Sequence, residues 1–469
     1  MTVNQEKSKQ WPQYLATIIG SLSTFGIGLQ FGWPSQAIPK ILSDEFPGNI
    51  TKDEASYILL IGPLSYLVAA PLFAFLGDII GRKKSLLLLA VPQVIAWILI
   101  AHARTAVIFY VARLIASASE GGLYAIYPMY IGEISEPKIR GILGSSLSVS
   151  ILVGQLIMTA YGSYTSLTVS AYIACVFPVL FLVLFVWMPE SPYYLLMRER
   201  RDDAEKSLRK LRRMENVDSE LERLTADVQR QMSEATTIKE LFKVESNRKA
   251  LRIMFWLRHF QQWCGIAPIA FYSQMIFKEG GDFLSPKVSS LIVFLTQTVF
   301  TFGTSLVIDK LGRRPLFIVS SIFTSLILYI LAVYFLVKGS NYDVSNFTWV
   351  PIVGMNLFMA FMSIGIGIAP NLMLSEMFSA SIKAKALSIC SIYFAICLSI
   401  TPQVYHLLET HLDICAPFFL FATSTLIGAM YAYVWMPETK GKTLEEIQQH
   451  LKGRDRKRKT TVQNVAKNA

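Results

Sequence analysis

Long apolar runs, separated by short polar segments, account for most of the chain. A helix needs about 20 mostly apolar residues to cross the hydrocarbon core of a bilayer, and we count twelve such runs. Their approximate bounds are 13–34, 55–76, 85–103, 105–131, 141–162, 166–188, 253–277, 288–308, 315–337, 349–375, 385–408 and 414–436. The pattern predicts an all-α membrane protein with twelve transmembrane helices. Composition agrees, because 16% of the 469 residues are charged, against about 25% in a typical soluble protein.

Several polar motifs occur twice, once in each half of the sequence and in the same order. The matching motifs are Asp78-x-x-Gly81-Arg82 and Asp309-x-x-Gly312-Arg313-Arg314, Glu133 with Arg140 and Glu376 with Lys383, and Pro189-Glu190 and Pro437-Glu438. A membrane unit that occurs twice is typical of transporters made of two bundles. We therefore predict two pseudo-symmetric six-helix bundles, 1–189 and 253–436, a cytoplasmic linker at 190–252 and a basic cytoplasmic tail at 437–469. Charges around a thin apolar stripe predict short amphipathic linker helices at 198–211 and 220–232, on the inner membrane surface.

The distribution of Lys and Arg predicts the orientation of the chain. Loops on the side of the N-terminus are basic, whereas the opposite loops are short and near neutral or acidic. Both N-x-T sequons, at Asn49 and Asn346, fall on that opposite side, where a glycosylation acceptor must lie. We expect a multi-pass plasma-membrane protein with both termini in the cytoplasm. The net charge of +11 then reflects this bias and not a nucleic-acid partner.

Signatures of other chemistry do not occur in the sequence. The five cysteines stand singly, without a C-x-x-C pair, and no P-loop for ATP is present. His406, Glu409 and His411 look only superficially like metal ligands, because they lack the H-E-x-x-H spacing. We expect no enzyme, no metal site and no cofactor.

The repeated charges predict a gate on the inner side. Carboxylates and guanidinium groups at the same depth can bridge the two bundles while this side is closed. Exposed ion pairs contribute about 0–1 kcal/mol each, but several together can bias a two-state equilibrium with a gap of a few kcal/mol. The predicted network consists of Asp78, Arg82, Arg113, Glu133, Arg140, Glu190, Asp309, Arg313, Arg314, Glu376, Lys383 and Glu438.

Together with a few further motifs, this order of residues resembles the sugar porters of the major facilitator superfamily, and within them the insect facilitated trehalose and hexose transporter-like proteins. The resemblance covers residues 13–450. It rests on Gly77-Asp78-x-x-Gly81-Arg82-Lys83, Arg113 with Gly121-Gly122, Pro128-Met129-Tyr130-Ile131-Gly132-Glu133, Arg140-Gly141, Pro189-Glu190-Ser191-Pro192, Gln261-Gln262-x-x-Gly265, Asp309-Lys310-x-Gly312-Arg313-Arg314 and Pro437-Glu438-Thr439-Lys440-Gly441. It implies a two-bundle fold, transport by alternating access and the same inner gate.

Uncharged hydrogen-bonding side chains on broken apolar spans are the candidates for a substrate site. They are Gln261, Gln262, Gln297, Asn371 and Ser148. Two adjacent glutamines in a span are costly unless partners meet them, and a polyhydroxyl ligand supplies many. Ordinary hydrogen bonds between helices are the alternative explanation. Gly and Pro predict breaks at 26–34, 120–128, 265–268 and 365–370.

The chain departs from the resembled family at several of these positions. Where relatives carry Asn, Trp, an Asn-Trp pair and Gln, this sequence has Ala267, Asn371, Phe394-Ala395 and Ser148. At roughly 0.5–1.5 kcal/mol per hydrogen bond, the loss of three polar contacts would weaken binding of the usual sugar by about 10–1,000-fold. Glucose, trehalose, another polyol or no transported solute therefore stay open.

We predict facilitated transport of a neutral sugar, a hexose or a trehalose-like disaccharide, by rocking of residues 1–188 against 253–436. The alternatives are a proton-coupled sugar symporter and a non-transporting sugar sensor on the same fold. Proton-coupled relatives carry an acid in the first span where the resemblance places Gly28, which favours passive flux. Glu120 in the fourth span is a candidate coupling residue, although a structural pairing with Arg113, on the same helix face, or with another cation is the simpler explanation.

Overall fold

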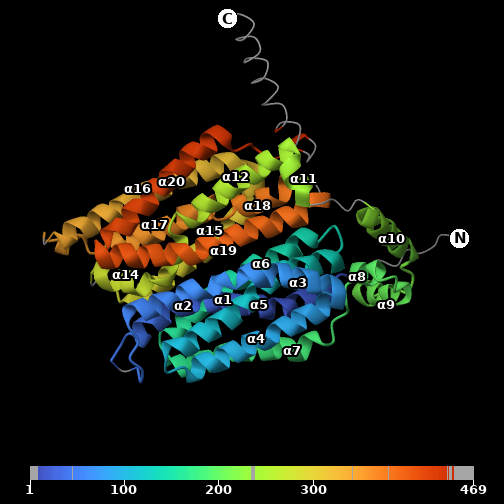
Figure 1. Cartoon of the computed structure of the whole chain (residues 1–469), viewed down its shortest axis with the longest axis horizontal. Coiled ribbons are helices and arrows are strands. Elements are labelled where there is room, and N and C mark those ends of the chain that lie inside the picture. The colour runs from blue at the N-terminus through green and yellow to red at the C-terminus, as the bar shows by residue number, and fades with distance from the viewer. Residues whose placement is uncertain are drawn as a thin grey trace, which may run out of the picture. The chain divides into compact units, whose positions relative to one another are not determined.

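A computed structural model provides the structure of the protein. It describes residues 9–440 apart from 45, 234–237, 282, 341 and 379, together with 442, 446, 447 and 451. The helices are α1 (Trp11–Ile41), α2 (Lys52–Leu64), α3 (Tyr66–Ile80), α4 (Arg82–His102), α5 (Ala106–Ile134), α6 (Arg140–Gly162), α7 (Leu167–Phe185), α8 (Pro192–Met197), α9 (Arg201–Arg212), α10 (Asp218–Ser233), α11 (Ile238–Lys243), α12 (Glu245–Gln262), α13 (Ile266–Phe271), α14 (Ser273–Gly280), α15 (Pro286–Leu311), α16 (Arg313–Gly339), the 3-10 helix η1 (Ser345–Phe347), α17 (Val350–Ile364), α18 (Ala369–Glu376), α19 (Ala380–His411) and α20 (Cys415–Trp435). The described residues contain no strand, so the predicted all-α class is confirmed (Figure 1).

Eleven segments of the described residues are helical, long and apolar enough to cross a membrane. They match the predicted spans except the seventh, 253–277. There the chain is divided into α12, α13 and α14, and Gly265 at the first break has a φ of +86°. The first of these pieces begins with a polar segment that contains Arg248, Lys249 and Arg252. For both reasons no single long apolar helix forms in this span.

The predicted helix breaks are confirmed in the second half of the sequence only. The chain is interrupted around Gly265 and again between α17 and α18, whereas α1 and α5 continue through their glycines and prolines. In α1 the glycines allow close packing against α6. A Cβ on Gly28 would overlap the carbonyl oxygen of Ile151, and a Cβ on Gly154 would overlap that of Phe25. Glycine in span one therefore marks a helix contact and not a break.

The chain forms two compact units. Unit 1 comprises Met1–Glu234, Ile269–Lys278 and Ser285–Phe294, and unit 2 comprises Ala235–Pro268, Glu279–Leu284 and Leu295–Ala469. In unit 1 one buried apolar cluster contains Tyr127 and Phe181, and another contains Trp33 and Trp97. In unit 2, α16 packs against α17 and α20. Each unit therefore has its own apolar interior.

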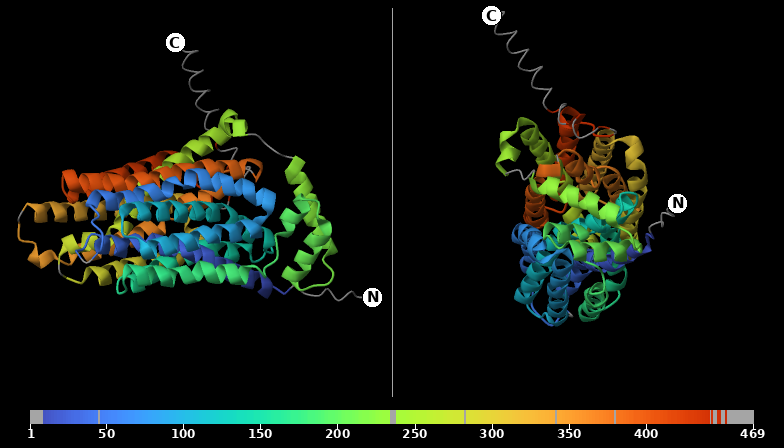
Figure 2. Two further views of the ribbon diagram at one scale, coloured as in Figure 1. Left: turned by 60° about the horizontal axis from the view of Figure 1, so that its bottom comes forward. Right: turned by 90° about the vertical axis from the view of Figure 1, so that its right-hand side faces the viewer.

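The amphipathic segments of the linker are helical, as predicted. Helices α8, α9 and α10 contact one another at one end of the unit-1 helices (Figure 2). Their apolar stripes form a buried cluster that consists of Tyr194, Leu195, Ala204, Leu208, Val217 and Leu221. Leu211 at the end of α9 belongs instead to an apolar core of unit 1. The apolar stripes of the linker helices are thus covered by protein, and α9 packs against an apolar core of unit 1 through Leu211.

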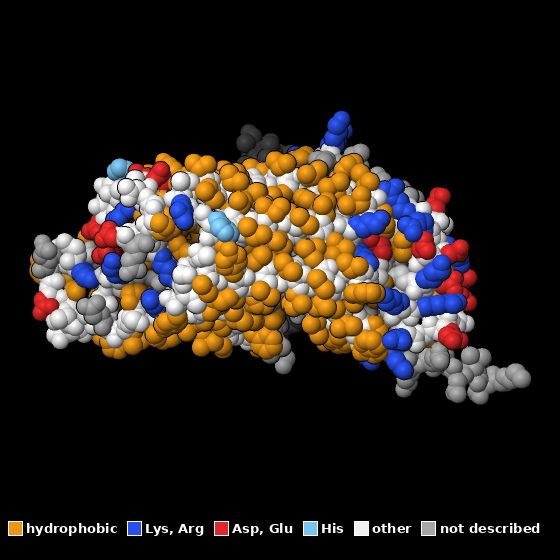
Figure 3. Space-filling view, turned by 90° about the horizontal axis from the view of Figure 1, so that it is seen from below, with side chains coloured by type: hydrophobic (Ala, Val, Ile, Leu, Met, Phe, Trp, Pro, Cys, Tyr) orange, Lys and Arg blue, Asp and Glu red, His pale blue; other side chains and the backbone are white. Residues whose placement is uncertain are grey.

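Large apolar side chains are exposed along the membrane-spanning helices. On the face shown in Figure 3, hydrophobic side chains gather over the middle, and charged side chains gather toward the two ends. Val68, Ile142 and Val183 are examples of exposed apolar residues on three different helices. Soluble monomers rarely expose apolar patches of this extent, so we assign this surface to contact with lipid.

Candidate functional site

Arg82, the first residue of α4, is the centre of a buried group of charges in unit 1. Its Nε lies 3.1 and 3.0 Å from the two carboxylate oxygens of Glu133 on α5, and its Nη2 lies 3.0 Å from Glu133 Oε1. Its Nη1 lies 3.0 Å from Asp78 Oδ1 and donates to Gly77 O at 2.8 Å. Ser191 Oγ donates to Glu133 Oε2. Arginine bonds that engage both oxygens of a carboxylate combine strength with a fixed geometry.

Glu190 binds the first turn of α4 through the backbone. Its Oε1 accepts hydrogen bonds from Lys83 N and Ser191 N, each at 2.9 Å. Gly81 has a φ of +101° at this turn, and a Cβ there would overlap the carboxylate; Gly312 makes the same turn in unit 2, with a φ of +91°. A carboxylate is favourable at a helix N-terminus because of the helix dipole. We call Asp78, Arg82, Glu133, Glu190 and Ser191 the N-half charge cluster.

Unit 2 repeats this arrangement with its own residues. Arg313 Nη2 donates to Glu376 Oε1 at 2.9 Å, and Thr439 Oγ1 donates to Glu376 Oε2 at 2.6 Å. Glu438 accepts from Arg313 N and Arg314 N, each at 3.1 Å, at the start of α16. We call Arg313, Arg314, Glu376, Glu438 and Thr439 the C-half charge cluster. The sequence repeat is therefore also a repeat of contacts.

Backbone hydrogen bonds hold the Glu438 carboxylate in its charged form. Burial is the largest single influence on its pKa and acts to raise it. Backbone N–H groups of Lys440, Arg313, Arg314 and Thr439 act in the opposite direction, and together they lower the pKa below its ordinary value. Lys440 N lies 2.8 Å from Glu438 Oε1. Glu438 thus acts as an anion across the physiological pH range.

The other residues of the predicted network have different surroundings. Arg140 is exposed and donates to Ser135 O at 3.2 Å. Arg113 lies apart from the N-half charge cluster, and its Nη1 donates to Gln30 Oε1 at 2.7 Å. The side chains of Asp309 and Lys383 lie outside the described residues. The ion pairs of the two clusters that we describe each join residues of one unit, so bridging between the bundles stays a prediction.

The predicted substrate residues on α12 have different hydrogen-bonding states. Gln261 Oε1 accepts from Arg258 Nη1 at 2.8 Å, and its Nε2 donates to Gly367 O at 2.9 Å, which ties α12 to the break after α17. The side-chain oxygens of Gln262 and of Gln297 on α15 are buried and have no hydrogen-bond partner in the described part of the chain. Gln262 and Gln297 therefore keep acceptors available, whereas the amide of Gln261 already holds the structure together.

The remaining polar candidates are on the surface of their helices. Asn371 on α18 is exposed, and its Nδ2 donates to Gly367 O at 3.0 Å. Ser148 is exposed on α6. Phe394, one of the unusual positions, lies under the buried guanidinium of Arg258, whose carbon is 5.1 Å from the ring centre. A cation over an aromatic ring is attractive, so this position has a packing role in the present chain.

Glu120 on α5 has a different partner from the one that the sequence suggested. Tyr66 on α3 donates to Glu120 Oε2, and Glu120 Oε1 is buried without a hydrogen-bond partner among the described residues. Arg113 donates to Gln30, and no direct ion pair joins it to Glu120 in this part of the chain. The carboxylate of Glu120 is thus hydrogen-bonded to Tyr66, while Arg113 acts on it as a nearby charge without a direct ion pair among the described residues.

Sequence reasoning missed several of these partners. Ser191 and Thr439 each follow a repeated Pro-Glu pair by one residue, so the repeat itself contained the signal. Tyr66 and Gln30 gave no signal, because a single polar residue in an apolar span predicts no particular partner. Arg258 stands in a predicted span, where a charge is costly, and this was a signal that we did not use.

Comparison with known proteins identifies the class of the molecule. The family model described as "Sugar (and other) transporter" matches residues 18–451. The chain belongs to the sugar transporter family. This membership confirms a multi-pass membrane transporter of the major facilitator type, which is not an enzyme.

Several sugar transporters are similar over most of this chain. The facilitated trehalose transporter Tret1 of Bombyx mori is 31% identical over 459 residues, which are 97% of this chain and 89% of that protein. Tret1 of Drosophila yakuba is 32% identical over 460 residues, but the chain spans only 53% of its length. The inward open structure of the xylose transporter XylE from E. coli has a TM-score of 0.77 at 21% sequence identity, covering 93% of this chain and 99% of that one. The last likeness shows a common fold.

Proposed function

We propose that this sugar transporter moves a neutral sugar, either a hexose or a trehalose-like disaccharide, across the membrane by facilitated diffusion. The observation that carries the proposal is that the amide oxygens of Gln262 and of Gln297 are each buried without a hydrogen-bond partner among the described residues. A buried amide oxygen without a partner costs free energy, and a sugar hydroxyl supplies the missing donor without adding charge. The similarity to facilitated trehalose transporters supports the same substrate class.

Uptake into vesicles tests this proposal directly. Purified protein in liposomes is given labelled trehalose, glucose, xylose, a polyol and a sugar acid, the last because Arg258 places a cation in the interior of unit 2. We expect saturable uptake of at least one neutral sugar, reduced in Gln262→Ala and unchanged in Glu222→Gln, which alters an exposed linker residue. Uptake of the sugar acid alone, or binding of a sugar without uptake, would contradict the proposal and would favour an anion carrier or a sensor.

A proton-coupled symporter is the second candidate, and the surroundings of Glu120 favour testing it. A buried carboxylate that accepts from one tyrosine hydroxyl, and whose other oxygen has no hydrogen-bond partner in the described part of the chain, can gain or lose a proton without breaking an ion pair. The same vesicles are loaded with a proton gradient and then treated with a protonophore. Facilitated diffusion predicts no change in the final sugar ratio. Sugar accumulation that collapses on adding the protonophore, and that does not occur in Glu120→Gln, would contradict facilitated diffusion and favour symport.

The two charge clusters are proposed to stabilise the state in which the inner side is closed. A double variant, Glu133→Gln with Glu376→Gln, releases Arg82 and Arg313 and should shift the protein toward the inward-open state. The reporter is Gly141→Cys, an exposed position where an added Cβ meets nothing within 4 Å. We expect faster labelling from the inner side in the double variant. Equal labelling rates at normal expression would exclude this gate.

We also propose a plasma-membrane location, both termini in the cytoplasm and glycosylation at Asn49 and Asn346. Both asparagines are exposed, Asn49 just before α2 and Asn346 in η1. Treatment of cell-expressed protein with a glycosidase should reduce its mass, and the shift should be lost in the double variant Asn49→Gln, Asn346→Gln. If the glycosidase did not change the mass of the parent protein, glycosylation would no longer support this orientation.

A further inference from the structure

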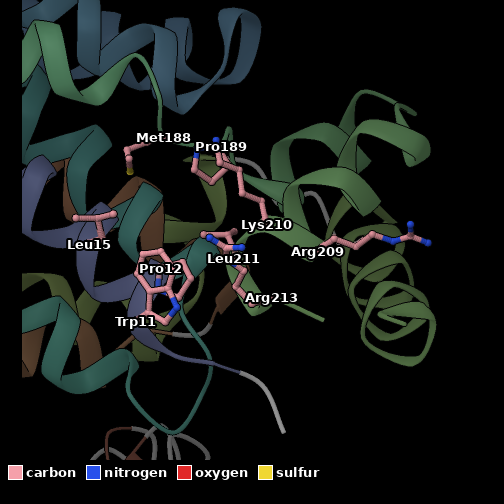
Figure 4. A pocket seen from close by; sticks show the side chains of 9 residues that line it. All are labelled: Trp11, Pro12, Leu15, Met188, Pro189, Arg209, Lys210, Leu211 and Arg213. Carbon is pink, nitrogen blue, oxygen red and sulfur yellow. The ribbon is translucent and has the colours of Figure 1, made fainter. Parts of the chain in front are cut away.

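A hollow of about 410 Å³ lies at one end of unit 1, where α1 begins and α7 and α9 end. The first turn of α1 contributes Trp11 and Leu15, and the segment after α7 contributes Met188. Lys210 of α9 and Arg213 directly after it complete the wall (Figure 4). The hollow therefore combines apolar side chains on the helices that cross the membrane with cations on a linker helix.

The two cations are held in place by the fold. Lys210 Nζ donates to Trp187 O at 2.6 Å, a bond that uses one of its three donors. The guanidinium carbon of Arg213 lies 5.2 Å from the ring centre of Trp11. Arg213 is in the left-handed region with a φ of +53°, and its N–H donates to Arg209 O at 2.8 Å. Two positively charged side chains, both held by contacts within the protein, thus line the same hollow.

Arg209 of the same helix provides a contrast. It also lines the hollow, but it forms an ion pair with Glu205, and in Figure 4 its guanidinium extends away from Lys210 and Arg213. The charge of Arg209 is therefore partly neutralised by Glu205. The helix therefore offers a natural control cation.

The side of the hollow toward the bilayer is apolar. Trp11 is 49% exposed and Trp187 is 72% exposed. Ile18, two turns further along α1, and Val183 on α7 are exposed as well. Tryptophan is enriched at the membrane interface, so this end of α1 and α7 has the composition of the headgroup region. Exposed apolar side chains thus occur on both α1 and α7, the two helices whose ends adjoin the hollow.

We propose that this hollow binds the phosphate group of an anionic phospholipid, with the acyl chains along α1 and α7. The cations suit the phosphate of the headgroup, and the exposed apolar side chains suit the acyl chains. A soluble phosphate compound would contact the cations but not the apolar side chains. Each cation near an anionic membrane surface contributes roughly 1 kcal/mol, a factor of about five in affinity. The site is independent of the sugar that the protein carries.

The bound lipid would act on the N-half charge cluster through α9. Ser207 Oγ donates to Glu190 O at 2.5 Å, and Arg212 Nη1 donates to Ile134 O at 3.0 Å beside the end of α5. A ligand that fixes the last turn of α9 therefore also fixes the backbone of Glu190. Occupancy of the hollow stabilises the cluster that we assign to the closed inner side.

The test uses the full-length protein in nanodiscs of phosphatidylcholine, with and without phosphatidylserine. We expect phosphatidylserine to raise the thermal midpoint of the parent. The rise should be largely lost in Lys210→Gln with Arg213→Asn, because Asn tolerates the left-handed conformation, and retained in Arg209→Gln. Phosphatidylserine with brominated acyl chains should quench the fluorescence of the parent more than that of Trp11→Phe, and brominated phosphatidylcholine should show no such difference.

Three outcomes would overturn the proposal. An equal phosphatidylserine effect in all variants would mean a general surface attraction. A full shift with glycerol 3-phosphate in pure phosphatidylcholine would mean that the hollow takes a soluble phosphate compound. A midpoint shift without selective quenching of Trp11 would place the lipid elsewhere. A phosphatidylserine-dependent rise that is largely lost in the double variant and retained in Arg209→Gln, together with selective quenching of Trp11, supports it.

Discussion

The N-half and C-half charge clusters share one plan, but the first is more enclosed. The side chains of Arg82 and Glu133 are 2% and 14% exposed, whereas those of Arg313 and Glu376 are 9% and 26% exposed. The linker contributes to this difference, because Ser207 of α9 donates to the backbone of Glu190 in the N-half cluster. Breaking an ion pair costs more where water is excluded. The N-half cluster should therefore be the more rigid of the two.

The helices behind the clusters differ in the same direction. In unit 1, α1 and α5 are continuous, Ser65 with its helical dihedral angles is the single residue between α2 and α3, and Gly28 and Gly154 bring α1 and α6 into close contact. In unit 2, the chain is interrupted near Gly265 and between α17 and α18. Helix interruptions free backbone groups and concentrate bending at few residues. We infer that unit 1 moves as one body and that the flexible points of the transporter lie in unit 2.

The largest expected effect concerns the two carboxylates that bind the arginines. Glu133→Ala leaves Arg82 buried without its main partner, and breaking a buried pair typically costs about 3–5 kcal/mol. Glu376→Ala should cost less, about 1–3 kcal/mol, because water reaches Arg313 more easily. Denaturant unfolding in detergent measures both. Glu222→Ala in the exposed part of the linker is the control, and equal losses at the two clusters would refute the contrast.

A second comparison, between Gln261 and Gln262 of α12, separates a structural role from a role in sugar binding. Gln261→Ala removes one of the two side-chain donors to Gly367 O, the other being Asn371 Nδ2, and it also removes the Gln261 oxygen that accepts from Arg258 Nη1. It should therefore lower stability by about 1–3 kcal/mol. Gln262→Ala removes an oxygen that has no partner in the described protein, so stability should hardly change. Instead, this variant should bind sugar about 2–12-fold more weakly, because one hydrogen bond contributes about 0.5–1.5 kcal/mol. Ligand-induced thermal shifts decide between these roles, and the reverse assignment would show that Gln261 is the contact with sugar.

The fold and the clusters could be predicted from the sequence to different depths. Span length and the twofold repeat are properties of many residues at once. The helices, and the correspondence between Arg82 in one half and Arg313 in the other, could therefore be predicted from the sequence. The signals at Gly28 and Gly265 were alike in sequence, although one glycine packs against α6 and the other interrupts a helix. The distance to the neighbouring helix decides whether a glycine allows close packing or interrupts its own helix. The local sequence pattern does not contain that distance. For the same reason the sequence placed Glu120 beside Arg113 and missed Tyr66.

A third variant tests whether unit 1 is the rigid body of the pair. Gly28→Ala places a Cβ against the backbone of Ile151, and overpacking of this kind costs about 1–3 kcal/mol. Gly144→Ala in α6 is the matched control, since an added Cβ meets nothing within 4 Å, and it should stabilise the helix by about 0.5–1 kcal/mol. Thermal midpoints with transport rates would show both effects. A harmless Gly28→Ala would mean that α1 and α6 can separate without cost, contrary to the rigid-unit inference.

The smallest effect concerns pH and the C-half cluster. Because hydrogen bonds lower the pKa of Glu438 in the folded protein below its ordinary value of 4.5, its contribution to stability is present in full above pH 4.5 and is lost as the pH falls through the lowered pKa. The difference in thermal midpoint between the parent and Glu438→Gln should stay constant between neutral pH and pH 5 and shrink only in more acidic buffer. Glu222→Gln corrects for general acid effects. A difference that already disappears between pH 7 and pH 5 would mean that Glu438 is protonated in the folded state at mild pH, and the C-half cluster would then lack the anion that fixes the start of α16.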